Sequence, residues 1–330
     1  MTNLDHGKFT RMTTVFHSLL ALDVFLLFFT GYAIMFNDEL WWMLTMMGGA
    51  GAVAGLHRAF GVGLLALVTF WMLMMVTTDV GRSNFKEIVP TPEDTKAFFQ
   101  DIQFVLGNAD ERHPNARQFA GGTADEIPLL SYIGKGVVFI FAAELTLLSV
   151  SGLLIWSKTG LMGLFATKTA AMAFVVFHGL LGVIMLMGVM FHIFEHGFHP
   201  AFFPVETKAF IPRSMIPESH EDDVEGTGIE RLSLSPGWAS ATNLFGAATV
   251  IGIVSVLLAS MYDTGYPVPE QLLVGGGATD LLLTVGVNIG MLVLFFGMVL
   301  SMYGNLVRIR WEQQMREEAE EDGVDAQTAD

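Results

Sequence analysis

The sequence predicts an all-α integral membrane protein with six transmembrane helices. Of its 330 residues, 52% are hydrophobic and only 15% are charged, whereas soluble domains carry roughly 25% charged residues. The mean hydropathy is positive, at +0.52. Apolar runs of about 20 residues, the length that crosses a bilayer as a helix, recur along the chain. Because lipid offers no hydrogen bonds to the backbone, such runs fold as helices.

These runs divide the chain into a four-helix bundle and an extension. We expect a domain at residues 1–217 with helices at about 13–35, 55–76, 133–156 and 170–196, an acidic cytoplasmic linker at 218–236, two further transmembrane helices within 237–304, and an acidic cytoplasmic tail at 305–330. A short helix is also expected within Thr91–Gly107, where Thr91 and Asp94 suit a helix start. We expect the tail to be disordered. No internal repeat is strong enough to support an argument.

Charge and cysteine content exclude several classes of protein. The chain has no cysteine, which excludes disulfides, cysteine-ligated iron–sulfur clusters and covalently attached c-type haem. The net charge of −16 is concentrated outside the apolar runs. It favours a salt-adapted surface of the kind that halophiles carry; the alternative is a solvated loop and a disordered tail. We expect no nucleic-acid partner.

The distribution of basic residues predicts the orientation in the membrane. Lysine and arginine in short loops remain on the cytoplasmic side. With the N-terminus inside, fourteen of these residues fall in inside segments, and only Arg58, Lys158 and Lys168 fall outside. The sequence therefore predicts a multi-pass protein of the plasma membrane with both termini in the cytoplasm.

Four histidines lie within the predicted spans. His57 and His178 are expected near the outer surface and are called the outer couple; His17 and His192 are expected near the cytoplasmic surface and are called the inner couple. Ionisable residues inside a membrane are functional candidates, although each histidine could also be a neutral imidazole in helix packing. His178 and His192 are fourteen residues apart, close to four helical turns, so they project from one face with ~21 Å between them.

Two imidazoles that face each other across helices suit the two axial positions of a haem in a four-helix bundle. The sequence therefore predicts two bis-histidine b-type haems, with the four histidines as metal ligands. Glycines on the same helices would leave room for a flat macrocycle, the alternative being close helix packing; they are Gly31, Gly61, Gly63, Gly179, Gly182 and Gly188. Arg58 is expected to pair with a haem propionate.

Four further ionisable residues are candidates for a role in proton transfer. Asp23 and Glu144 lie inside spans, where they would bond each other or serve a proton path; the alternative is a protonated carboxyl bonded to nearby backbone. His196 and His199 follow His192 at i+4 and i+7. We interpret them as proton donors beside a bound quinone, the alternatives being a metal site and plain interfacial placement.

The histidine spacing and several fragments together resemble a known family. The fragments are TG (30–31), LHRAFGV (56–62), IGKGVVF (133–139), SGLLIW (151–156), FHIFEHGFHP (191–200) and RSMIP (213–217). Over roughly residues 10–217 the chain is similar to the di-haem cytochrome b, or gamma, subunit of membrane-bound formate dehydrogenases, and to related subunits of nickel–iron hydrogenases and thiosulfate reductases. Thr14 and Ser18 depart from this family, which often has Arg and Trp there.

The resemblance implies a prokaryotic respiratory-chain subunit with two haem b groups and no catalytic residue of its own. His57 and His178 would hold the outer haem, and His17 and His192 the inner one. An iron–sulfur subunit of a larger oxidoreductase would donate electrons at the outer face, and membrane quinone would accept them near the cytoplasmic side. Two alternatives remain open from the residues: a free-standing b-type reductase, and a metal or proton transporter that uses the same histidines.

Overall fold

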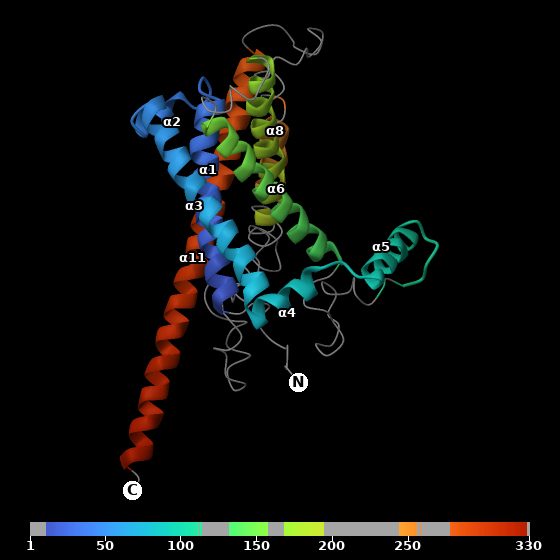
Figure 1. Ribbon diagram of the computed structural model, residues 1–330, viewed down its shortest axis with the longest axis vertical. Helices are drawn as coiled ribbons and strands as arrows, with labels where there is room; N and C mark the ends of the chain where they lie inside the picture. The colour runs from blue at the N-terminus through green and yellow to red at the C-terminus, as the bar shows by residue number, and fades with distance from the viewer. Residues whose placement is uncertain are drawn as a thin grey trace.

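The computed structural model describes residues 11–111, 113, 132–157, 168–194, 244–255, 258 and 278–328. All regular secondary structure in these residues is helical (Figure 1). The helices are α1 (Arg11–Met35), α2 (Trp41–Met46), α3 (Ala50–Thr77), α4 (Asp79–Ile88), α5 (Pro92–Val105), α6 (Tyr132–Trp156), α8 (Lys168–Ile193) and α11 (Ala278–Thr328), with a shorter helix at Leu244–Ser255. The predicted all-α class is confirmed.

Five helices are long and apolar enough to cross a membrane, namely α1, α3, α6, α8 and α11. At 1.5 Å per residue, the 25 residues of α1 and of α6 extend ~38 Å, more than a hydrocarbon core of about 30 Å. Large apolar side chains such as Phe70, Val76 and Phe139 are exposed on their outer surfaces, as expected of side chains that contact lipid. The chain is therefore an integral membrane protein. Of the span expected before α11, the structure describes only Leu244–Ser255 and Leu258.

Helix α1 lies at the centre of the bundle and contacts α3, α8 and α11. The rings of Phe28 and Tyr32 on this helix and of Phe36, which directly follows it, stack one turn apart with centroid separations of 5.6 and 5.5 Å. All three side chains are buried. The Tyr32 hydroxyl donates a hydrogen bond of 2.7 Å to the carbonyl of Gly182 on α8, which satisfies the polar end of an otherwise apolar ring.

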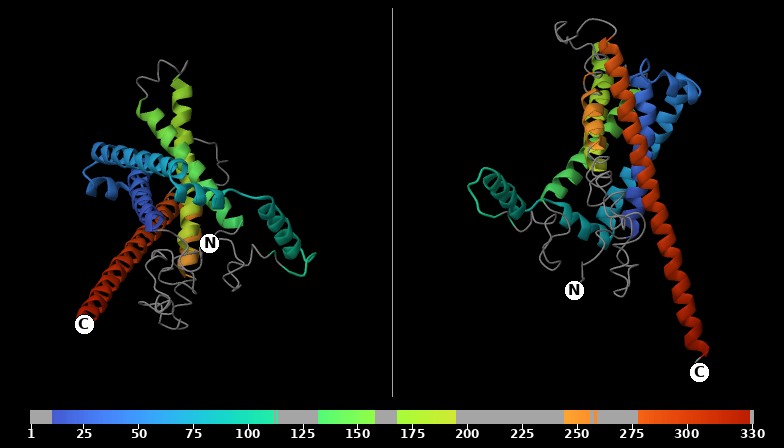
Figure 2. Two further views of the ribbon diagram at one scale, coloured as in Figure 1. Left: turned by 60° about the horizontal axis from the view of Figure 1, so that its bottom comes forward. Right: turned by 180° about the vertical axis from the view of Figure 1, so that it is seen from behind.

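The last helix is longer than the sequence predicts. We expected a span ending near residue 304 and a disordered tail, but α11 continues without a break from Ala278 to Thr328. Its second half extends beyond the bundle (Figures 1 and 2). The expectation was wrong because residues 305–321 contain no proline or glycine, and Glu, Arg, Gln, Ala and Met have high helix propensity even where no apolar face is buried.

A connection at one end of the bundle joins α1 to α3 and was missed in the sequence. It contains the short helix α2 and two glycines with positive φ, Gly48 and Gly49. The indole N–H of Trp42 donates a hydrogen bond of 2.8 Å to the side-chain oxygen of Asn288 on α11. The side-chain amide of Asn288 in turn donates a hydrogen bond of 3.1 Å to the carbonyl of Glu39. These two bonds attach the connection to the last helix.

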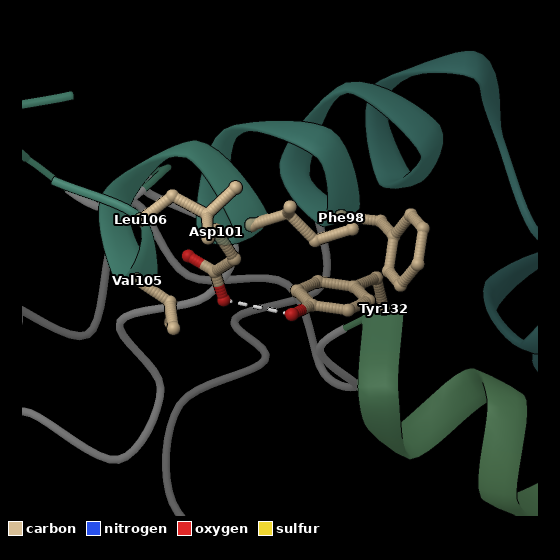
Figure 3. Close-up of a pocket in the computed structure, with 6 residues that line it drawn as sticks. Phe98, Asp101, Val105, Leu106 and Tyr132 are labelled. Carbon is tan, nitrogen blue, oxygen red and sulfur yellow. Dashed lines mark hydrogen bonds between the residues drawn. The ribbon is translucent and has the colours of Figure 1, made fainter. Parts of the chain in front are cut away.

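At the opposite end of the bundle, α5 is attached to the first turn of α6. The predicted start of α5 is confirmed as a capping box, in which Thr91 and Asp94 bond each other's backbone. Lys135 of α6 forms a buried ion pair with Asp94 at 2.9 Å. The Tyr132 hydroxyl donates a hydrogen bond of 2.7 Å to the carboxylate of Asp101. Both residues line a shallow, mainly apolar hollow, together with Phe98, Val105 and Leu106 (Figure 3). Two polar contacts thus fix the position of α5.

Candidate haem-binding site

The structure brings the four intramembrane histidines together as two couples. The rings of His57 on α3 and His178 on α8 have centroids 6.3 Å apart and lie nearly perpendicular, at 84°. The rings of His17 on α1 and His192 on α8 have centroids 6.2 Å apart, at 56°. The pairing predicted from helix depth is therefore observed, with α8 contributing one imidazole to each couple.

In the outer couple, both rings are hydrogen-bonded through the same atom. The Nδ1 atom of His57 lies 3.0 Å from the hydroxyl of Thr30 on α1, and Nδ1 of His178 lies 2.8 Å from the hydroxyl of Ser151 on α6. Each hydroxyl belongs to the helix that packs against the histidine's own helix, because α1 packs on α3 and α6 packs on α8. Thr30 and Ser151 were not among the residues predicted for the site.

A glycine follows each of these hydroxyl residues and makes room for the ring. A Cβ atom added at Gly31 would lie 3.0 Å from Cε1 of His57, and one at Gly152 would lie 3.2 Å from Cε1 of His178. Both distances are shorter than ordinary van der Waals contact. The glycines therefore allow each imidazole to lie directly against the neighbouring helix, so the room at Gly31 is for the ring of His57; the expected room for a macrocycle stays a prediction.

The inner couple has different surroundings. The ring of Phe141 on α6 lies edge-on to His192, with centroids 6.0 Å apart. A Cβ atom at Gly188 would lie only 2.6 Å from Phe141, so this glycine allows the phenyl ring to approach His192. Gly188 is thus a packing position for an aromatic neighbour of the couple.

Both couples fit a metal held between two imidazoles. A metal–imidazole bond is about 2.0 Å and a ring centroid lies about 1.2 Å behind its nitrogen, so trans imidazoles on one metal have centroids about 6.4 Å apart. The observed 6.2 and 6.3 Å agree with this value. Among the described residues no three His, Cys, Asp or Glu side chains gather to hold an ion. The two nitrogens of each couple match the two axial positions of a haem.

The other predicted site residues have varied surroundings. Arg58 is exposed beside His57. Gly61 has open space at its Cβ position, whereas a Cβ at Gly182 would contact the Tyr32 hydroxyl at 4.0 Å and one at Gly179 would contact Met35. A Cβ at Gly63 would lie 3.0 Å from the carboxylate of Asp23. His196 and His199 lie outside the described residues.

Asp23 and Glu144 each have one buried oxygen, Oδ2 and Oε2 respectively, without a hydrogen-bond partner. The two carboxyls are on α1 and α6, the helices that supply the hydroxyls of the outer couple. Neither of these two oxygens forms a mutual hydrogen bond, which was one of the alternatives that the sequence left open. Each carboxyl stands seven residues before a hydroxyl residue, Asp23 before Thr30 and Glu144 before Ser151.

Helical spans with facing intramembrane histidines define a class of protein that carries haem within the bilayer. The sequence model of the family described as prokaryotic cytochrome b561 matches residues 8–213. This is more than half of the chain, and the chain belongs to that family. It is therefore a membrane protein that takes part in electron transfer through b-type haem. Neither the curated proteins nor the solved structures gave a match to this chain.

Gly31→Ala is expected to weaken haem retention roughly tenfold. This is the lower end of the range of effects seen when the contacts that orient a metal ligand are disturbed. The new methyl group would push against Cε1 of His57 and tilt the ring. The haem-to-protein ratio through successive detergent washes measures this effect. Gly136→Ala on α6, where nothing lies within 4 Å of the added Cβ, is the matched control. Equal haem retention in the two variants would contradict the prediction.

Proposed function

We propose that this chain is a two-haem electron-transfer subunit that connects an iron–sulfur protein at the outer membrane face with quinone near the cytoplasmic face. The observation that carries the proposal is the pair of histidine couples, with centroid separations of 6.3 and 6.2 Å. His178 and His192 share one face of α8 and are ~21 Å apart along it. Two haem positions on one helix suit transfer across the bilayer.

Each residue of the proposed site has a simple role. His57 and His178 would supply the axial nitrogens of the outer haem, and His17 and His192 those of the inner one. When bound, haem b supplies one-electron transfer. Gly31 and Gly152 let the imidazoles of the outer couple lie close to their neighbouring helices. Arg58, exposed beside His57, would neutralise a propionate at the protein surface.

The partners are proposed from the resemblance to formate dehydrogenase gamma subunits. An iron–sulfur subunit and a catalytic oxidoreductase subunit would bind where His57 and His178 approach the outer surface. Quinone would bind beside the inner couple, and His196 and His199, which follow His192 in the sequence, would donate protons. In this orientation both termini are cytoplasmic, and α4 and α5 are on the quinone side.

Purified protein tests the haem part of the proposal. The expected result is two b-type haems per chain by pyridine haemochrome, with two components in a redox titration followed at the α band. One haem per chain, or none, would overturn the two-haem assignment. A colourless protein that moves metal ions or protons in vesicles would instead support the transporter alternative.

Affinity purification from native membranes tests the partner part. Co-purification of an iron–sulfur protein, together with quinone reduction by the isolated complex, is the expected result. A two-haem chain that purifies alone and reduces a soluble acceptor would support the free-standing reductase and would overturn the subunit assignment.

A further inference from the structure

The hydrogen bonds of the outer couple determine which ring nitrogen is available to a ligand. The hydroxyl of Thr30 donates a hydrogen bond of 2.7 Å to the carbonyl of Leu26, and the hydroxyl of Ser151 donates one of 2.7 Å to the carbonyl of Leu147. A hydroxyl has one proton. With that proton on the carbonyl, each oxygen accepts from the imidazole, so Nδ1 of His57 and of His178 carries a proton and Nε2 of each ring is the free electron-pair donor. This tautomer is assigned from the hydrogen-bond geometry.

The same arrangement occurs twice at a constant sequence spacing. Thr30 and His57 are 27 residues apart, and so are Ser151 and His178. The second pair follows the first by 121 residues. At this offset, His57–Phe70 (HRAFGVGLLALVTF) aligns without a gap on His178–Phe191 (HGLLGVIMLMGVMF), with six of fourteen residues identical.

The preceding helices align at the same offset. Ala21–Gly31 (ALDVFLLFFTG) aligns on Ala142–Gly152 (AAELTLLSVSG), which pairs Asp23 with Glu144, Thr30 with Ser151 and Gly31 with Gly152. We infer that α1–α3 and α6–α8 are two copies of one helical hairpin. The copies run in the same direction (Figure 1), as in parallel repeats related by an axis along the membrane normal. This repeat corrects the expectation that no internal repeat in the chain is strong enough to support an argument.

We propose that Thr30 and Ser151 are positioning residues that hold the two outer histidines as matched axial ligands, one from each copy of the hairpin. The proposal rests on the assignment of His57 and His178 as haem ligands. A partner that accepts the second ring N–H of a metal-bound histidine fixes the ring's orientation and makes the ligand nitrogen more electron-rich. Each hydroxyl is itself held by its own helix, so neither imidazole can rotate without breaking a bond.

The inner couple lacks this repeat symmetry. His17 is on the first helix of one copy and His192 is on the second helix of the other. At the 121-residue offset, the counterpart of His17 is Val138 and the counterpart of His192 is Trp71. Thr30 and Ser151 bond the histidines of the outer couple, so the two haems should respond differently to loss of either hydroxyl.

The variants Thr30→Val and Ser151→Ala, alone and together, test the proposal in the full-length chain. Each removes an acceptor and keeps the side chain close to its original size. A less electron-rich imidazole stabilises the oxidised iron less, so the midpoint potential of one haem is expected to rise while that of the other stays unchanged. Retention of that same haem is expected to fall by about tenfold to a hundredfold.

Control variants separate positioning from general packing. Ser149→Ala removes a hydroxyl from the same helix as Ser151, one that bonds only the Leu145 carbonyl 2.8 Å away, and should change neither haem. Thr30→Ser and Ser151→Thr keep the acceptor, should restore the original potential, and provide a folded comparison if the apolar variants express poorly. Unchanged potentials in Thr30→Val/Ser151→Ala, or equal shifts in both haems, would overturn the proposal.

A failure of the positioning role and a failure of the proposed function give different results in these experiments. If His178→Ala retains both haems, the ligand assignment itself is wrong. If His178→Ala loses one haem while Thr30→Val/Ser151→Ala keeps both haems at their original potentials, the assignment stands and only the positioning role fails.

Discussion

His178→Ala is expected to reduce the haem content from two per chain to about one, because iron with one missing axial nitrogen binds its haem much more weakly. The lost component should be the one whose potential responds to Thr30 and Ser151. His192→Ala should remove the other component. Pyridine haemochrome analysis and a redox titration of purified protein measure both effects.

Two substitutions guard against an indirect effect on folding. His178→Gln keeps most of the volume of the imidazole but not its nitrogen ligand, and should lose the same haem. His113→Ala changes a histidine in the polar segment, where its Nε2 lies 4.0 Å from a carboxylate oxygen of Glu93, and should retain both haems. A His178→Ala protein with the full complement of pigment would refute the ligand assignment.

Lys135→Met is expected to release α5 from the end of the bundle. Oδ2 of Asp94 accepts bonds from Lys135 at 2.9 Å and from the backbone and side chain of Thr91, while its Oδ1 is buried without a partner. Removal of the lysine leaves a buried carboxylate uncompensated, which typically costs about 3–5 kcal/mol. Hydrogen exchange of the α5 amides should then accelerate by about a hundredfold to a few thousandfold, since each tenfold corresponds to ~1.4 kcal/mol.

An exposed ion pair on the same helix provides the control. Lys96 lies 2.6 Å from Glu93, with the two side chains 67% and 56% exposed, and such pairs contribute little to stability. Lys96→Met should therefore leave exchange in α5 unchanged. The double variant Lys135→Met/Asp94→Leu removes both buried charges but also the capping box of α5, so it should recover only part of the protection. Similar exchange rates in Lys135→Met and Lys96→Met would contradict the role of the buried pair.

Because of the same ion pair, the attachment of α5 to the bundle should be independent of pH near neutrality and should weaken only at acidic pH. Burial raises the pKa of Asp94, but hydrogen bonds from Lys135 and Thr91 outweigh it, so the pKa lies below the ordinary value of 3.8. A carboxyl with a lowered pKa in the folded state stabilises that state fully above its ordinary pKa. Protection of α5 should therefore be constant from neutral pH down to about 5 and fall only below about 4. A loss of protection near pH 6 would point to a different group.

The predicted spans matched the observed helices where the length of an apolar run was the only signal needed. Helices α1 and α6 agree with the expected 13–35 and 133–156 to within two residues, and the capping residues Thr91 and Asp94 located the start of α5. Helix depth and the fourteen-residue spacing also predicted which histidines face each other. These features depend on local sequence and on the thickness of a membrane, both of which can be read from one chain.

The missed features depend on contacts between distant segments. Thr30 and Ser151 are ordinary helix residues until α3 and α8 place an imidazole against them, 27 residues further along the chain. A comparison of the sequence with itself at an offset of 121 would have found both. Helix α2 was missed because its six residues give no periodicity of their own, and its position depends on Asn288 of α11.

The length of α11 has a mechanical consequence. Its apolar span ends at Arg310 and the helix continues to Thr328, which extends it by ~27 Å. A continuous helix resists bending, so the end of the chain stands off from the lipid by about the diameter of a small domain. Any group fused at that end, such as a fluorophore for distance measurements, would report the tilt of α11 instead of averaging over a flexible tether.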